Sequence, residues 1–387
     1  DGDERSTLAA ARALVAAGHQ VMVGARGRWS LAGVSRRVEV APFLPDPLRD
    51  PAGFTACVAE VVRAHRIELL LPVTDASVAA LLEFHERLPA GVQLPFPDLP
   101  RWREATDKER SLAAAEQAGL EIPRSIVLQG PTALAELPGP EFFPAFVKPH
   151  RSVTAGEDGG GVKLAVVPVQ DPDACRATLR TLPASAFPVL LQREIVGPGE
   201  GLFLLRWEGR IVAAFAHRRL REKPPWGGVS VFRESIPLPP ELLAAGTALL
   251  KALDWRGVAM IECKRDLVTG RHAFMEINGR FWGSLQLALD AGVDFPRLLA
   301  ECVGGGRPSA VLSYRTGVRS RWFWGDVDHL YLRLRHGPSR LSAIGEFLAW
   351  RPAHDREETW RWGDPAPFIL ETMRRFGVPG RRRPRRG

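Results

Sequence analysis

Helical and strand patterns alternate through the first part of the chain, residues 1–97. Helices are predicted over 6–18, 54–65 and 78–88, and extended segments over 21–23, 67–72 and 93–96. Strands that alternate with helices in this way favour a small parallel sheet of the Rossmann-like kind. Because no G-x-G-x-x-G follows any predicted strand, the sequence does not support dinucleotide binding here.

Antiparallel patterns replace this alternation in the second region, residues 98–305. Pairs of apolar strand segments are separated by short turns that contain Gly209 and Gly270, which predicts hairpins over 202–216 and 258–278. Other strands are predicted over 145–149, 162–167 and 189–195, and helices over 107–119, 285–291 and 295–302. The predicted fold class is therefore mixed, α/β in the first region and α+β with antiparallel sheets in the second.

The last region, residues 306–387, is predicted to be a helical extension with a basic, disordered tail. Tryptophans concentrate here, around 322–324 and 360–362. Such aromatic residues either line a substrate pocket or pack a helical extension onto the main domain, and we favour packing. The arginine-rich tail at 381–386 is a solubilising end or a site for nucleic acid and acidic surfaces, and we favour the solubilising end.

Length and composition indicate a globular protein of more than one domain. The chain has 387 residues, of which 45% are hydrophobic, and its net charge is +8. No apolar run reaches about 18 residues, so no transmembrane helix is predicted. The four cysteines lie far apart without metal-finger spacing, which favours reduced thiols and a cytoplasmic location. The chain begins at Asp1 without an apolar signal segment, and we expect the first strand of the amino-terminal domain to precede it.

The most informative polar pattern lies on the second strand of the last predicted hairpin. Glu276, Asn278 and Arg280 occupy alternate positions, and alternate residues of a strand point to the same face. Carboxylate and amide oxygens are hard ligands that suit Mg²⁺, and an arginine can grip a phosphate with two N–H groups. This strand therefore predicts a site for a metal ion and a nucleotide.

Glu262 lies on the first strand of the same hairpin. Hairpin pairing would place its carboxylate beside that of Glu276, and two carboxylates with one amide can hold Mg²⁺ ions that bridge nucleotide phosphates. The alternative is a surface hairpin with ordinary charges. We favour the metal site because the order Glu…Glu-x-Asn-x-Arg is unusual for chance.

Further candidates for nucleotide binding precede this hairpin. Lys148 ends an apolar strand before a glycine-rich loop that contains Gly159 and Gly160, and backbone N–H groups of such loops can close over phosphates. Lys108 would by itself be a solvated helix charge. Taken alone these signals are weak, since most glycine-rich loops are only turns.

The segment from Gln192 to Ile195 ends a buried strand and could offer backbone groups to an adenine edge. Glu200 follows closely and could accept hydrogen bonds from ribose, although it could equally be a simple loop carboxylate. Arg219 lies in a basic segment, residues 217–221, which enters a Gly/Pro loop. That concentration of cations suits an anion site, and a solvated basic edge strand is an equal alternative.

The order of these parts resembles the ATP-grasp superfamily. Lysine on a helix, Val-Lys-Pro, a glycine loop, a Gln-x-Glu-Ile hinge and Glu…Glu-Ile-Asn-x-Arg follow one another as they do in its carboxylate–amine ligase branch. The similarity is to the large chain of carbamoyl-phosphate synthase and to biotin carboxylase, and it covers roughly residues 1–305. It implies a Rossmann-like pre-ATP-grasp domain over 1–97, an ATP-grasp domain over 98–305 and the carboxy-terminal extension over 306–387. Gly279 stands where proline is common in the motif.

The resemblance also implies a role for each candidate residue. Lys108 and Lys148 would bind the phosphates of ATP, and Arg280, with Arg219, would stabilise charge on the transferring phosphoryl group. The remaining implied contacts are the glycine loop at Gly159 and Gly160, the adenine hinge at Gln192, Glu194 and Ile195, the ribose partner Glu200, and the ligands of Mg²⁺ (or Mn²⁺) Glu262, Glu276 and Asn278.

The implied activity is a ligase that joins a carboxylate to an amine or similar nucleophile through an acyl phosphate, with release of ADP and phosphate. The partners would be two small molecules, with no membrane and no nucleic acid, and a homodimer stays open. Two alternatives remain: a phosphotransferase on the same scaffold, and a basic nucleic-acid-binding protein that uses the arginine tail.

Overall fold

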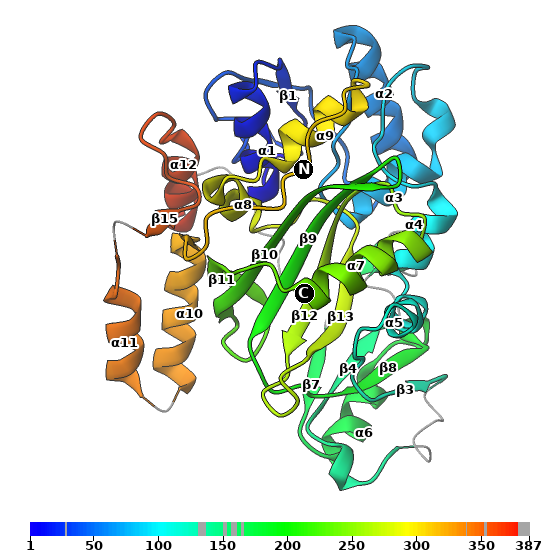
Figure 1. Cartoon of the computed structure of the whole chain (residues 1–387), viewed down its shortest axis with the longest axis vertical. Helices are drawn as coiled ribbons and strands as arrows, with labels where there is room; N and C mark the ends of the chain where they lie inside the picture. Colours follow the sequence, from blue (N-terminus) through cyan, green and yellow to red (C-terminus); the bar gives the residue numbers. More distant parts are fainter. Residues whose placement is uncertain are drawn as a thin grey trace.

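The computed structural model describes residues 1–27, 29–130, 137–149, 166–337, 339–351 and 354–377, together with the backbone of 153–155 and 161–163. Gly159, Gly160 and the arginine tail at 381–386 lie outside these residues. Among the described helices, none is long and apolar enough to cross a membrane. Two sheets of unequal size dominate the chain, and helices from the amino-terminal part cover one end of the larger sheet (Figure 1).

The amino-terminal part contains the predicted alternation of helices and strands, although its sheet is small. Strands β1 and β2 pair in parallel, and a single parallel bridge joins Leu69 to Gln93. The strand predicted over 67–72 is therefore reduced to this bridge. Its elements are α1 (Arg5–Ala16), β1 (Val21–Val23), β2 (Val38–Val40), α2 (Pro51–His65), α3 (Asp75–Glu83), η1 (His85–Arg87) and α4 (Leu99–Thr106).

A four-stranded antiparallel sheet follows, in the order β3-β8-β4-β7. Helix α6 packs on it and buries Cys175 and Leu179 against Val147 and Leu191. The strand predicted over 162–167 is divided between two separate pairings, β5 with β6 and β7 with β4. The elements here are α5 (Lys108–Gln117), β3 (Ser125–Leu128), η3 (Pro140–Phe142), β4 (Ala145–Pro149), β5 (Val153–Ala155), β6 (Gly161–Lys163), β7 (Val167–Val169), α6 (Pro172–Thr181), η4 (Ala184–Ala186) and β8 (Val189–Arg193).

The larger sheet has seven strands in the order β13-β12-β9-β10-β11-β14-β15. Both predicted hairpins are present, β9 with β10 and β12 with β13. Glu208 and Gly209 both have positive φ, at 47° and 78°, as a two-residue hairpin turn requires. The elements of this part are β9 (Gly199–Trp207), β10 (Arg210–Lys223), β11 (Val229–Ser235), α7 (Pro240–Ala252), β12 (Gly257–Arg265), β13 (His272–Asn278), α8 (Leu285–Ala291) and α9 (Phe295–Val303).

Each face of the larger sheet has its own apolar core. On one face, Phe203, Phe215 and Met260 pack against residues of α1, α8 and α9. On the other, Leu204 and Ile261 pack against residues of α4, α5 and α7. Because neighbouring residues of a strand point to opposite faces, this division shows which face each polar residue of the sheet occupies.

The carboxy-terminal region differs from a purely helical extension, because it adds two strands to the larger sheet. Strand β14 pairs antiparallel with β11, and β15 pairs in parallel with β14. Trp322 and Trp324 donate from their indole N–H groups to Glu371 and Thr372, so these tryptophans pack within the region as favoured, while Trp362 is 90% exposed. The elements are β14 (Arg319–Arg321), α10 (Phe323–His336), α11 (Arg340–Leu348), β15 (Asp355–Glu357) and α12 (Ala366–Arg375).

Candidate active site

Two carboxylates lie side by side near one end of the larger sheet. Glu262 on β12 is the cross-strand partner of Glu276 on β13, and Met260 is the partner of Asn278. Both carboxylates are on the face that α8 and α9 cover further along the strands. Asn278 donates from Nδ2 to Oε1 of Glu276 at 3.1 Å. The pairing of Glu262 with Glu276 that the hairpin predicted is thus present, with an amide beside it.

Arg280 follows β13 and is held by the amino-terminal part. Its Nε and Nη2 donate to the two carboxylate oxygens of Asp75, at 3.0 and 3.1 Å, and Nη2 also donates to Oδ1 of Asn278 at 3.0 Å. Burial alone would lower the pKa of Arg280, but Asp75 and then Glu276 outweigh it and raise the pKa. The guanidinium is therefore a fixed cation beside the acidic pair.

Two lysines of the smaller sheet and its adjoining helix face the same acidic pair, Lys108 buried and Lys148 half-buried. Lys148 on β4 donates to the side chain of Gln192, and Lys108 at the start of α5 donates to the carbonyl of Pro149 at 2.7 Å. Burial lowers the pKa of both ammonium groups, that of Lys148 to about 8, while the negative charge of Glu276 opposes this shift in each case. Lys108 is thus a buried residue of the site, not a solvated helix charge.

The predicted hinge connects the two sheets through backbone groups. The N–H of Glu194 donates to the carbonyl of Pro144 at 2.9 Å, and Lys264 on β12 donates to the carbonyl of Ile195 at 3.0 Å. Both hinge residues are half-buried. The side chain of Gln192 is buried, and its two ends bind Lys148 and Ser125. Gln192 therefore positions the lysine.

Glu200 lies near the start of β9, on the face of the sheet away from the acidic pair. It is the cross-strand partner of Cys263, and so it points to the face opposite Glu262. Its carboxylate is 2% exposed and binds Nε2 of His272 at 2.8 Å. A contact of Glu200 with ribose stays a prediction, and the carboxylate would have to share its acceptor oxygens with His272, 72 residues away.

Arg219 on β10 joins Glu262 of the acidic pair to Glu222. Its Nη2 lies 2.5 Å from Glu262, its Nη1 lies 3.0 Å from Glu222, and its side chain is 11% exposed. The alternative of a solvated basic edge strand is therefore wrong at this position. Burial would lower the pKa of Arg219, but Glu262 and Glu222 more than offset this and raise it.

The arrangement fits a hard cation held between protein and phosphate oxygens. Within the described residues no three His, Cys, Asp or Glu side chains gather as a metal site by themselves. Two carboxylates and one amide oxygen nevertheless form a donor set of the type that Mg²⁺ accepts when phosphates complete its coordination. The surrounding cations, Lys108, Lys148 and Arg280, would neutralise those phosphates.

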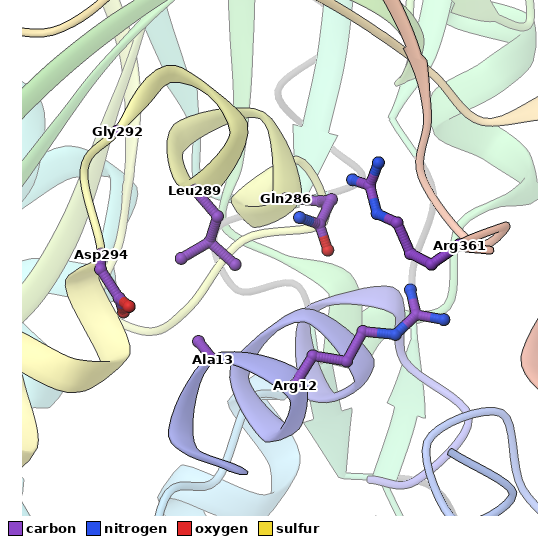
Figure 2. A pocket seen from close by; sticks show the side chains of 7 residues that line it. All are labelled: Arg12, Ala13, Gln286, Leu289, Gly292, Asp294 and Arg361. Carbon is purple, nitrogen blue, oxygen red and sulfur yellow. The ribbon is translucent and has the colours of Figure 1, made fainter. Parts of the chain in front are cut away.

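A separate cavity of about 360 Å³ lies between α1, α8 and the carboxy-terminal region. Figure 2 shows Arg12, Arg361 and Gln286 grouped on one side of it, with Asp294 apart on the other. Both guanidinium groups are neutralised by ion pairs, Arg12 with Asp364 and Arg361 with Asp290. The residues of the acidic pair do not line this cavity, so it is distinct from the candidate site.

Several residues that lie near the acidic pair could not be identified from the sequence. Asp75 reads in the sequence as an ordinary acidic residue in the first turn of a helix, and only the fold brings it to Arg280. His217 and Arg233 also lie on the face of the acidic pair, on β10 and β11. Burial, and after it the charges of Arg219 and Arg233, hold the pKa of His217 well below its usual range. The only sequence pattern that indicated this part of the site was the cluster of basic residues at 217–221.

Comparison with known proteins shows similarity in structure alone. No protein-family model and no curated protein matches the sequence. An L-amino acid ligase from Bacillus licheniformis superposes with a TM-score of 0.58 at 16% identity, over 78% of this chain and 72% of that one. A biotin carboxylase in a beta-gamma-ATP complex, from Campylobacter jejuni, gives 0.63 at 12% identity, over 82% and 72%.

A third solved structure, a synthetase by name, has the same fold. The N5-carboxyaminoimidazole ribonucleotide synthetase from Thermus thermophilus superposes with a TM-score of 0.58 at 17% identity, over 82% of this chain and 80% of that one. At such identities the similarity establishes a shared fold. The order of parts found in the sequence and the architecture of the structure thus agree on one fold.

Proposed function

We propose that this chain, which has the ATP-grasp fold, is an ATP-dependent ligase that joins a carboxylate to an amine or a similar nucleophile. The observation that carries the proposal is the acidic pair Glu262 and Glu276, which faces Lys148 of β4 and Lys108 of α5 and has Arg280 beside it. The names of the three similar structures, a ligase, a synthetase and a carboxylase, are consistent with this class of reaction.

In the first step the substrate carboxylate attacks the γ-phosphorus of ATP, the bond to the β-phosphate oxygen breaks, and ADP leaves. Lys108 and Lys148 would neutralise the phosphates, and Arg280 would stabilise charge on the phosphoryl group as it moves. Glu262, Glu276 and Asn278 would hold Mg²⁺, which supplies further charge neutralisation when bound. Transfer of this kind needs positioning and charge stabilisation rather than a covalent nucleophile of the protein.

In the second step the amine attacks the acyl carbon, inorganic phosphate leaves with the C–O bonding pair, and the nitrogen loses a proton. An acyl phosphate hydrolyses readily, so water must be kept away. We expect the segment 223–228 to close over the site when ATP binds. Hydrogen exchange in this segment should slow when ATP and Mg²⁺ are added, and unchanged exchange would remove this role.

The test of the proposed function is ADP release over pairs of carboxylic acids and amines, followed by trapping with hydroxylamine. An acyl phosphate yields a hydroxamate, whereas a phosphotransferase yields a stable phosphorylated product that hydroxylamine leaves intact. Formation of a hydroxamate that requires both ATP and the acid supports the ligase. A phosphorylated product, or no ATP turnover with any pair, would overturn it.

A further inference from the structure

A line of cross-strand partners runs over five strands of the larger sheet and begins at the acidic pair. Each member is the cross-strand partner of the next, and all lie on the face that α8 and α9 cover further along the strands. The partners, in order, are Glu276, Glu262, Gly201, His217 and Ser235. Strands are spaced about 4.8 Å apart, so His217 lies roughly 10 Å from Glu262 on the same face.

His217 is a buried polar side chain without a partner. It is 1% exposed, and neither of its ring nitrogens has a hydrogen-bond partner among the described residues. Gly201 makes room for the ring, since a Cβ there would lie 3.2 Å from Nε2 of His217. The ring meets Phe203 edge-on at 4.7 Å between centroids. Native proteins rarely leave such buried groups unpaired, so a ligand is expected to complete this imidazole.

Cations surround the same imidazole. Arg219 follows two residues later on β10, and Arg233 on β11 is the cross-strand partner of Arg219 and is fully buried. Arg233 shares the carboxylate of Glu358 with Arg5 of α1, so two guanidinium groups compete for one negative charge. Arg219 relies in part on Glu262. If Glu262 turns to a metal ion, as the proposed function requires, Arg219 loses part of its compensation.

A second unpaired donor belongs to a residue that packs on the same aromatic ring, Phe203. Trp282 packs on Phe203 with ring centroids 4.4 Å apart, and its indole N–H is buried without a partner in the described part of the chain. Donors and cations thus predominate around His217. An ammonium group would be repelled here, whereas an oxyanion would be stabilised by charge-assisted hydrogen bonds.

We propose that His217, Arg219 and Arg233, here named the basic row, form a subsite for a second anionic group of the acyl substrate. The inference rests on the proposed function, which places the reacting carboxylate of that substrate beside Glu262 and Glu276. The separation of roughly 10 Å along the sheet leaves room for a short linker between the reacting carboxylate and the second anion. The acyl substrate is therefore a short dicarboxylic acid or an acid with a comparable oxyanion, and the basic row selects it against monoacids.

The test compares dicarboxylic acids with monocarboxylic acids of equal length, succinate with butyrate and glutarate with valerate. Binding to the full chain is measured by tryptophan fluorescence or calorimetry in the presence of Mg²⁺ and ADP. The wild-type chain is expected to bind the dicarboxylic acid at least about 10-fold more tightly. Equal affinity for both classes of acid would overturn the proposal, whatever the variants do.

Two variants and a control assign the preference to the basic row. His217→Leu removes the imidazole and is expected to reduce the preference to less than about threefold, while His217→Gln retains a donor and an acceptor and should keep most of it. Arg206→Met removes a mostly buried cation of β9, distant from the row along the strands, and should leave the preference unchanged. A full preference in His217→Leu would overturn the proposal.

Binding of ADP separates this proposal from the proposed function. Wild type and His217→Leu should bind Mg²⁺ and ADP with the same affinity, because the imidazole makes no hydrogen bond to the predicted nucleotide or metal residues within the described chain, and Arg219, which does bind Glu262, is unchanged in this variant. If the wild-type chain bound no ADP at all, the proposed function would fail together with the subsite. If ADP binds and dicarboxylic acids show no advantage, the subsite alone fails.

Discussion

The charge of Lys148 depends on pH in a range that experiments reach. Burial lowers the pKa of this ammonium group to about 8, below its ordinary value of 10.5. Between these two values the unfolded chain binds more protons at Lys148 than the folded chain does. Its contribution to the free energy of unfolding therefore rises with pH through this window, since deprotonation removes the cost of a buried charge.

Nucleotide binding should show the opposite dependence on pH. Phosphates favour the ammonium form of Lys148, so binding above about pH 8 requires the uptake of a proton. The dissociation constant of ATP is expected to rise by up to about tenfold per pH unit above this value. A titration series between about pH 7 and about pH 9.5 measures it.

The matching variant is Lys148→Arg, whose guanidinium keeps its charge throughout this range. Its affinity for ATP should be lower than that of the wild type because the geometry changes, but it should vary little with pH. A wild-type dissociation constant that stays constant above pH 8, or an equally steep rise in the variant, would show that Lys148 does not titrate against the nucleotide.

The acidic pair yields a second prediction at the scale of single residues. Glu276→Gln keeps the size of the side chain and its hydrogen bond with Asn278, but it removes the charge that metal and lysines require. We expect ATP-dependent turnover to fall on the order of 100-fold or more. The free energy of unfolding should change by less than about 1 kcal/mol, because the side chain is half-buried and keeps its contact with Asn278.

Steady-state ADP release and urea denaturation measure these two quantities. Glu116→Gln, an exposed carboxylate on α5, is the matched control and should leave both unchanged. Full turnover in Glu276→Gln would contradict the assignment of a metal ligand. If turnover is lost and the variant is also unfolded, Glu276 has a structural role and the experiment does not support a metal ligand.

The sequence predicts a site residue well where its neighbours along the strand carry the signal. Glu276, Asn278 and Arg280 share one face by alternation, and Glu262 follows from the hairpin. The contact of Glu200 with His272 could not be read from the sequence, because His272 is 72 residues away on β13 and no local pattern shows to which face of β9 Glu200 points. His217 was hidden for a similar reason: its significance comes from Gly201 and Arg233 on neighbouring strands.

At the scale of elements, α3 connects the amino-terminal part to the site. Asp75 occupies its first position and binds Arg280 through both carboxylate oxygens. Asp75→Asn would leave the mostly buried guanidinium without its counter-charge and free to rotate away from Asn278. We expect kcat/KM to fall about 10-fold to 100-fold, with a loss of about 1–3 kcal/mol in the free energy of unfolding.

Asp98→Asn is the control for this prediction. Asp98 precedes α4 and, like Asp75, is an acidic residue at the start of a helix, but its carboxylate binds the neighbouring Arg101 at an exposed site. Activity in this variant should match the wild type. Equal losses of kcat/KM in the two variants would attribute the effect to the helices rather than to Arg280.

Local elements were predicted more reliably than their pairing. The hairpins followed from alternating apolar residues and from Gly209 and Gly270, which are signals contained within a few residues. Strands β14 and β15 were missed because three-residue segments carry little periodicity, and β15 joins the sheet only through β14. The segment at 67–72 has the composition of a strand, yet the fold provides a partner for one residue of it.

At the scale of the whole molecule, the carboxy-terminal region fastens the amino-terminal part to the larger sheet. Asp364 accepts from Arg12 at 2.8 Å, from the hydroxyl of Ser35 at 2.5 Å and from the N–H of Arg36 at 3.0 Å. Glu358 binds Arg5 of α1 and Arg233 of β11. In Figure 1 the segment that contains β15 and α12 lies beside α1, although it is at the opposite end of the sequence.

This arrangement predicts that Asp364 contributes strongly to stability. Asp364→Ala leaves Arg12, which is 13% exposed, without its ion pair and removes two further hydrogen bonds to the amino-terminal part. We expect the free energy of unfolding to fall by about 2–4 kcal/mol, as it does when one partner of a mostly buried ion pair is removed. The control Asp173→Ala removes a carboxylate whose side chain is 94% exposed, and it should change stability by less than about 0.5 kcal/mol.

Urea denaturation measures the loss, and limited proteolysis shows where it arises. In Asp364→Ala the region 354–377 should be cleaved sooner than in the wild type, while the hairpins of the larger sheet remain protected, because their core on both faces does not depend on Asp364. Because Glu358 orients Arg5 and Arg233, loosening this region should also weaken dicarboxylate binding before it weakens ADP binding. A variant as stable as Asp173→Ala, or one in which both ligands are lost together, would show that the carboxy-terminal region is not what joins α1 to the sheet.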